Sequence, residues 1–168
     1  MRGTNCRWLP KLILRKPSEK EEDYLNRLYI IFCNDLKAHQ PLFKGLRVGC
    51  RHYPEINGRE EGFYHLTSCD YEKTGFENRE LDEDRCERLN WIKPVIENYG
   101  CSDSCCHRLL TWSESRGRYE RTWILFVDER YIVVLDKRKG YYVVVTAYYI
   151  DEEHEHEYQR YLAQHLSK

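Results

Sequence analysis

Two histidines, His52 and His65, are the residues best suited to acid–base chemistry in this chain. They fall in two segments, 43–52 and 62–67, which we expect to form neighbouring strands. Histidine exchanges protons near neutral pH, and two such groups are what attack of a ribose 2′-hydroxyl on the adjacent phosphate requires. A tyrosine can replace one of them as the acid, and an arginine or lysine can stabilise the charged phosphate. The alternative is that both are ordinary strand histidines.

Basic and aromatic residues form a second set of candidates. The set consists of Arg47, Arg51, His52, Arg85, Arg88, Trp91, Lys93 and the turn Lys137-Arg138-Lys139. Arg85 and Arg88 are three residues apart, which predicts that both point to one helix face. Arginine provides fork-shaped donors for phosphate, and aromatic rings provide stacking platforms for unpaired bases. Acidic residues are interleaved throughout, so the alternative is a solvated, ion-paired surface.

A third group could hold a metal ion. It consists of Cys101, Cys105, Cys106 and His107. Zinc sites usually combine two ligand pairs that are separated by a longer loop. Only one such unit is present here, unless Cys69 or Cys86 completes it in space. We therefore favour a loop of free thiols over zinc, and we expect no metal and no other cofactor.

Composition and missing motifs narrow the classes of function. The formal net charge of the 168 residues is −1, so any nucleic-acid site must be a local basic patch. No apolar run reaches the roughly 20 residues that span a bilayer, and the N-terminus does not resemble a signal peptide. We therefore predict a soluble, cytoplasmic protein with reduced cysteines. The sequence has no phosphate-binding glycine loop, no G-x-S-x-G elbow and no H-E-x-x-H, which argues against nucleotide-dependent motors, α/β-hydrolases and zincins.

The elements that would carry these residues follow an α+β pattern. An apolar stripe behind a capping box at Ser18 predicts a helix over 19–38. A second helix is expected over 81–91, with acidic residues at its N-terminus. Apolar runs between 109 and 149, separated by short polar turns, predict an antiparallel meander. The charged segment 151–167 predicts a C-terminal helix.

The expected organisation is one domain, 1–168. It divides into an N-terminal segment (1–17), a core (18–150) and the C-terminal helix (151–168). In this fold, N-terminal helices pack on an antiparallel sheet of roughly four to six strands.

Several short motifs follow one another between Leu42 and Tyr149. They are GLRV (45–48), RHYP (51–54), GFYHL (62–66), RCERLNWIKP (85–94), YIVVL (131–135) and YYVVVTAY (141–148). Their order resembles that of a family of small phage- and prophage-associated proteins. That family is grouped with the barnase, EndoU, colicin and RelE (BECR) class of metal-independent ribonucleases.

This resemblance implies an α+β fold with an RNA-cleaving site on the concave face of the sheet. Carried onto this chain, the catalytic positions are His65, Arg85, Arg88, Thr146 and Tyr148. The expected substrate-binding positions are Arg51, His52, Trp91 and Arg138. His65 would act as the base, the arginines would hold the phosphate, and Thr146 or Tyr148 would support the leaving oxygen. The product would be a 2′,3′-cyclic phosphate.

The resemblance also implies partners. RNA would be the substrate, and a toxin of this kind would need an antitoxin or immunity protein inside the cell. The alternative is a non-enzymatic module that binds nucleic acid or protein. In one form of that alternative, the Cys101–His107 cluster binds zinc and stabilises the module.

Overall fold

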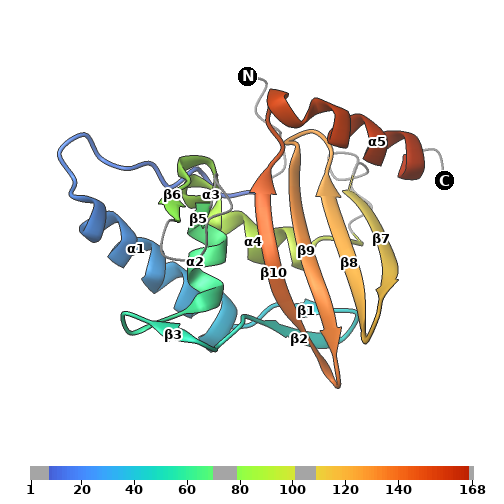
Figure 1. Ribbon diagram of the computed structural model, residues 1–168, viewed down its shortest axis with the longest axis horizontal. Helices are drawn as coiled ribbons and strands as arrows, with labels where there is room; N and C mark the ends of the chain where they lie inside the picture. The colour runs from blue at the N-terminus through green and yellow to red at the C-terminus, as the bar shows by residue number, and fades with distance from the viewer. Residues whose placement is uncertain (1–7, 70–78, 101–108, 167–168) are drawn as a thin grey trace.

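The computed structural model describes residues 8–69, 79–100 and 109–166, and it has an α+β fold. The helices are α1 (Glu21–Cys33), α2 (Glu61–Thr67), α3 (Glu83–Glu87), α4 (Ile92–Glu97) and α5 (Glu155–His165). A π-helical segment, Asn34–Ala38, extends α1, and a 3-10 turn, Leu89–Trp91, joins α3 to α4. Another 3-10 turn, Glu152–His154, precedes α5. In Figure 1, α1 to α4 lie beside and behind a curled sheet, and α5 crosses one end of it.

The main sheet has six strands in the order β1-β2-β10-β9-β8-β7. They are β1 (Leu42–Phe43), β2 (Leu46–Gly49), β7 (Leu109–Arg116), β8 (Tyr119–Phe126), β9 (Tyr131–Arg138) and β10 (Tyr141–Tyr149). The predicted meander is confirmed as β7 to β10, which are joined by short turns and pair antiparallel.

The pairing of β2 with β10 corrects the prediction of an antiparallel sheet. β2 runs parallel to β10, with Val48 opposite Tyr142. A tight turn forces antiparallel pairing, but β2 and β10 are far apart in the sequence and no hairpin sets their direction. Two short antiparallel pairs lie outside this sheet, namely β3 (Glu55–Ile56) with β4 (Arg59–Glu60) and β5 (Ser68–Cys69) with β6 (Glu80–Leu81). Asn57 and Gly58, which both have positive φ, form the turn that connects β3 to β4.

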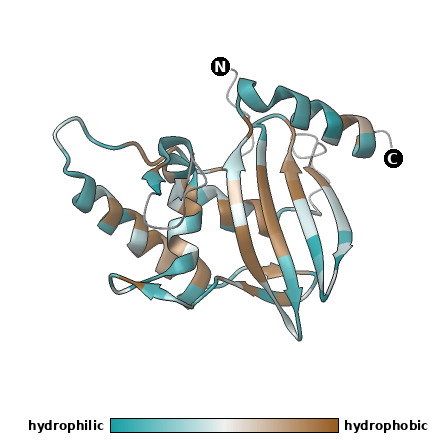
Figure 2. Cartoon of the chain, in the orientation of Figure 1, coloured by the Kyte–Doolittle hydropathy of each residue, from teal (hydrophilic) through white to brown (hydrophobic). Residues whose placement is uncertain are grey.

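The sheet separates two clusters of buried apolar side chains. Along β8 the side chains alternate, so Ile124 and Phe126 face the first cluster and Trp123 and Leu125 face the second. Helices α1 to α4 cover the first cluster, and α5 covers the second. Figure 2 shows the apolar residues concentrated on β8, β9 and β10, whereas α5 is mostly hydrophilic. Both faces of the central strands are therefore buried.

The predicted strand over 62–67 is wrong, because these residues belong to helix α2. Phe63 and Leu66 are both buried and are three residues apart, which is helical spacing. The Thr67 hydroxyl donates to the Phe63 carbonyl oxygen at 2.9 Å, one helical turn back. The aromatic and β-branched residues suggested a strand, but packing against α3 and β10 selects the helix. His65 is therefore a helical residue.

Two further predictions need correction. Helix α1 begins at Glu21 after Lys20, and no side chain caps it, so the Ser18 capping box is absent. Glu19 instead accepts hydrogen bonds from Arg27 and from the Lys16 main chain. The first predicted strand ends at Gly49, so Arg51 and His52 lie in the loop that follows it.

Candidate active site

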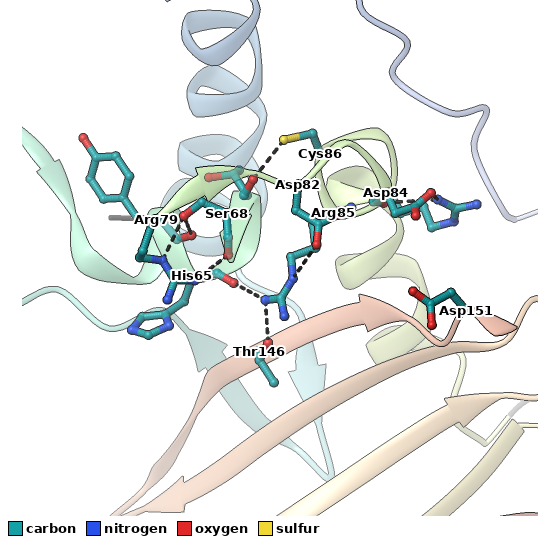
Figure 3. A network of polar contacts seen from close by, with 12 residues as sticks. His65, Ser68, Arg79, Asp82, Asp84, Arg85, Cys86, Thr146 and Asp151 are labelled. Atoms are coloured by element: carbon teal, nitrogen blue, oxygen red, sulfur yellow. Dashed lines mark hydrogen bonds and ion pairs between the residues drawn. The ribbon is translucent and has the colours of Figure 1, made fainter. Parts of the chain in front are cut away.

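Arg85 is the centre of a polar cluster between α2, α3 and β10. It lies in α3. The side chain of Asp82, the N-cap residue of this helix, accepts a hydrogen bond from the Arg85 main-chain N–H at 3.1 Å. Its Nη1 donates to the main-chain oxygen of His65 at 2.6 Å and to Thr146 Oγ1 at 3.1 Å. Figure 3 shows this guanidinium reaching from α3 to Thr146. Residues from three separate elements are thereby brought together.

The Arg85 guanidinium keeps donor capacity that its neighbours do not use. Its Nε is 3.4 Å from Asp82 Oδ2, which makes an ion pair without the geometry of a hydrogen bond. Its Nη2 makes no hydrogen bond within the part of the chain that the structure describes. The side chain is 16% exposed, so an anion could reach Nη2 from solvent. A guanidinium held in this way is suited to bind a phosphate oxygen.

A β-bulge in β10 sets the position of Thr146. The register with β9 shifts between Val144 and Thr146. Before the bulge Val144 packs in the first cluster, and after it Ala147 does, so the alternation of the strand is reversed. Beyond Val143 the strand has no β2 partner, and α2 and α3 lie against it there. Arg85 hydrogen-bonds to Thr146 at this part of the β10 edge, which has no strand partner on the β2 side.

His65 has the properties of a general base. Its Nε2 lies 3.0 Å from Glu61 Oε1 one helical turn earlier, and its side chain is 28% exposed. Burial lowers the pKa of His65 below its ordinary value of 6.5, and the charges of Arg79 and Arg51 lower it further, against the Glu61 carboxylate, which raises it. When Glu61 accepts the Nε2 proton, the lone pair of the neutral imidazole is on Nδ1. Nδ1 makes no hydrogen bond among the described residues.

The structure does not bring Arg88 to this cluster. Helix α3 ends at Glu87, so the expected shared helix face with Arg85 is lost. The Arg88 side chain is 5% exposed and pairs with Asp84 at 3.1 Å. Its guanidinium carbon lies 4.5 Å from the centre of the Tyr149 ring. Arg88 is therefore packed inside the fold, and a phosphate does not have direct access to it.

Tyr148 and Trp91 also have internal partners. The Tyr148 hydroxyl donates to Glu157 Oε1 at 2.9 Å, and burial raises the pKa of this tyrosine. Its ring centre is 5.6 Å from the guanidinium carbon of Arg85. Trp91 is buried, and its indole nitrogen donates to the Pro10 carbonyl oxygen. Neither side chain presents a free group to a substrate, so we leave both out of the proposed site.

Arg51, His52 and Arg138 come together elsewhere, in a pocket of about 820 Å³ at the end of β2. The pocket also includes Arg47 and Tyr53. The charge of Arg51 also lowers the pKa of His65 in the neighbouring helix α2.

Sequence reasoning missed Glu61 and Arg79. Glu61 is four residues before His65, and this spacing would have pointed to it if the segment had been recognised as a helix. Arg79 donates from Nε to Ser68 Oγ at 2.9 Å, and its charge acts on His65. It lies in a polar stretch that has no periodicity, so nothing in the sequence singled it out. We call His65, Arg85 and Thr146, with Glu61 and Arg79, the Arg85 cluster. Figure 3 shows His65, Arg79, Arg85 and Thr146 of this cluster.

The zinc alternative falls outside the described residues, because Cys101, Cys105, Cys106 and His107 are not among them. Cys69 and Cys86, the residues that might complete it, are free thiols, and burial raises the pKa of Cys86 to about 12. Within the ranges 8–69, 79–100 and 109–166, no three Cys, His, Asp or Glu side chains are grouped to hold a metal ion. The same ranges contain no helix with the length and apolarity to cross a membrane.

Comparison with known proteins adds no further information about this site. No protein-family model, no curated protein and no solved structure matches the chain.

Proposed function

We propose that this protein is a metal-independent endoribonuclease that cleaves RNA by attack of a 2′-hydroxyl on the adjacent phosphate. The observation that carries the proposal is the bridge made by Arg85 Nη1 between the His65 main chain and the Thr146 hydroxyl. The bridge joins the main chain of the helix that carries the His65 imidazole to a guanidinium and a hydroxyl from two other elements. These are the groups that this reaction uses.

Each residue of the cluster has a role in the proposed reaction. His65 Nδ1 takes the proton of the 2′-hydroxyl, and Glu61 holds the imidazole in the tautomer that leaves Nδ1 free. Arg85 Nη2 binds a phosphate oxygen and neutralises the charge that develops there. Thr146 accepts its hydrogen bond from Arg85, so its own proton is available to the phosphate. The 2′-oxygen then bonds to phosphorus as the bond from phosphorus to the 5′-oxygen breaks. The 5′-oxygen takes a proton from solvent water, and a 2′,3′-cyclic phosphate remains.

The test is incubation of the purified protein with total RNA in the presence of a metal chelator. We expect cleavage, with products that end in 2′,3′-cyclic phosphate when they are analysed by mass spectrometry. His65→Gln should lose cleavage by about 100-fold or more, as is typical for loss of a general base. The matched control is His154→Gln, an exposed histidine at the start of α5 that bonds only to Asp151.

Two results would contradict the proposal. One is cleavage that disappears with chelator and returns with magnesium. The other is an equal, mild effect of the two histidine substitutions.

A non-enzymatic RNA-binding module is the second candidate. It is favoured by one observation, namely that Arg85 and His65 both already have partners inside the protein. A protein of this kind would bind RNA in chelator and leave it intact, and His65→Gln would bind as the parent does. A growth-arrest assay on expression, with and without His65→Gln, separates a toxin from such a module.

A further inference from the structure

The pocket at the end of β2 has a charge that the rest of the molecule does not share. Its lining includes three arginines and a histidine, Arg47, Arg51, Arg138 and His52, and no aspartate or glutamate. The whole chain, in contrast, has 27 Lys and Arg against 28 Asp and Glu. Arg138 lies 3.7 Å from the buried Asp136 carboxylate, but Arg47, Arg51 and His52 have no acidic partner among the described residues. Bringing positive groups together in this way is unfavourable, so a bound anion would stabilise the arrangement.

Most of these basic side chains are available for a ligand. Arg47, Arg51 and His52 make no hydrogen bond or ion pair through their side chains among the described residues. Elsewhere arginines are paired, for example Arg27 with Glu19 and Arg121 with Asp136. Arg47, Arg51 and His52 therefore form a group of free donors at the end of β2, where a polyanion could meet several of them at once.

The fold holds these arginines in place. Gly62, at the start of α2, donates its main-chain N–H to the Arg51 carbonyl oxygen at 3.2 Å. A Cβ at Gly62 would lie 2.9 Å from that oxygen, so the close approach needs glycine. On the opposite side of the pocket, the Arg138 guanidinium carbon lies 3.7 Å from the centre of the Tyr119 ring. The main chain of Arg51 is therefore fixed against the same helix that carries His65.

Two tyrosines on the pocket add a surface for bases. Tyr53 is 83% exposed and Tyr141 is 47% exposed, and both line the pocket. Exposed aromatic rings beside arginines are the combination by which proteins bind unpaired bases together with their phosphates. A volume of about 820 Å³ is also in the range of pockets that hold small ligands.

We propose that this pocket is a subsite for single-stranded RNA, separate from the Arg85 cluster. Arg47 and Arg51 contact backbone phosphates, Arg138 contributes to the positive field, and Tyr53 stacks on an unpaired base. This inference rests on the proposed function in taking RNA as the ligand. The subsite anchors the strand on one side of the scissile bond, and α2 links the anchor to His65.

The test measures binding without cleavage. The probe is a fluorescein-labelled 2′-O-methyl RNA oligonucleotide, which has no 2′-hydroxyl to attack, and fluorescence anisotropy gives the Kd. The double variant Arg47→Gln/Arg51→Gln should weaken binding by tenfold or more. Its slope of log K against log salt should become shallower by about 1.4, since each phosphate contact to a single strand contributes about 0.7. Tyr53→Ala should weaken binding by about tenfold through lost stacking.

The control variant is Lys20→Gln/Arg160→Gln, which removes the same charge from exposed positions just before α1 and on α5. It should bind as the parent does. Equal weakening in this control, or unchanged binding in the pocket variant with its melting curve intact, would overturn the subsite. A duplex RNA that binds as tightly as the single strand would also overturn it, because paired bases cannot stack on Tyr53.

The two proposals fail in different ways. If the protein binds the probe through the pocket and cleaves no RNA, the subsite stands and the ribonuclease proposal fails. If RNA is cleaved and the pocket variant binds and cleaves as the parent does, the ribonuclease proposal stands and the subsite fails.

Discussion

Arg85 is held by the fold through Nη1, while its Nη2 makes no hydrogen bond among the described residues. Its Nη1 is held by two oxygens on different elements, and Asp82 provides a nearby counter-charge. A long side chain loses conformational entropy when it is ordered, and here the fold has already ordered it before a ligand binds. Arg88, three residues later, is ordered by burial instead. The two arginines, three residues apart, are therefore held in different ways: Arg85 by hydrogen bonds and Arg88 by burial.

Substitution of these two arginines separates the roles. Arg88→Ala should lower the free energy of unfolding by about 2–3 kcal/mol, because it removes a buried side chain packed on Tyr149 and Trp91. Arg85→Ala should cost about 1 kcal/mol and reduce cleavage by about 100-fold. Urea unfolding and initial cleavage rates measure the two effects. A stable but inactive Arg88→Ala protein would contradict this assignment.

The pH dependence of cleavage follows from His65. A base works only when it is unprotonated, so activity is present above its pKa and is lost as the pH falls through it. Because the pKa of His65 is lowered, the acid limb of kcat/KM should have its midpoint below pH 6.5. Arg51→Gln removes a charge that lowers this pKa, so the limb should move to higher pH. A midpoint above 6.5, or a shift in the opposite direction, would exclude His65 as the base.

At the scale of elements, α2 is the connection between the two proposed sites. Its first turn packs on the main chain of Arg51, and its last turn carries His65 and packs against α3 and β10. The Gly62 N–H donates to the Arg51 carbonyl oxygen, so a movement of α2 away from this loop would break that hydrogen bond. The position of α2 therefore determines where the pocket lies relative to the Arg85 cluster.

Replacement of Gly62 tests this packing. Alanine normally stabilises a helix relative to glycine by about 1 kcal/mol, yet Gly62→Ala should destabilise the protein by about 1–3 kcal/mol, because its Cβ would meet the Arg51 main chain. Gly100→Ala is the control, since a Cβ there would meet nothing within 4 Å. Its effect should stay within about 0.5 kcal/mol. Thermal unfolding by circular dichroism compares the two, and a stabilised Gly62→Ala protein would refute the close contact.

At the scale of the whole molecule, the sheet is shared by two cores. Each central strand contributes alternate side chains to both clusters, so neither cluster can be lost without disturbing the other. Helix α5 covers the second cluster through Tyr158, whose hydroxyl donates to the Val127 carbonyl oxygen at 3.0 Å. The same helix provides Glu157, the partner of the Tyr148 hydroxyl. We therefore expect the described core to unfold as one cooperative unit.

Tyr158→Ala tests that cooperativity. It removes a buried ring and should lower the free energy of unfolding by about 3 kcal/mol. Leu166→Ala, at an exposed position just beyond α5, should change it by less than about 0.5 kcal/mol. Tryptophan fluorescence and far-ultraviolet circular dichroism should report a single, coincident transition in each variant. Separate transitions for the two probes would show that the second core unfolds independently.

The sequence by itself determined the elements whose signals are local. The meander between 109 and 149, the helix with buried Tyr24 and Leu28, and the acidic start of α3 follow from periodicity and from turn and cap residues within a few positions. These elements can be predicted from the sequence because each signal depends on residues within one helical turn or one strand. The resemblance pointed to His65, Arg85, Arg88, Thr146 and Tyr148 as catalytic, and this stays a prediction. In the structure, Arg85 hydrogen-bonds to the His65 main chain and to the Thr146 hydroxyl.

Only the tertiary structure decided what depends on residues far apart in the chain. The helical state of 62–67 is selected by packing, because its aromatic and β-branched residues fit either state locally. The parallel pairing of β2 with β10 and the burial of Arg88 are likewise set by partners that lie many residues away. The same is true of the basic pocket, which combines Arg51 with Arg138 across the sheet. Such contacts form only when distant segments are packed against one another, so no local pattern can encode them.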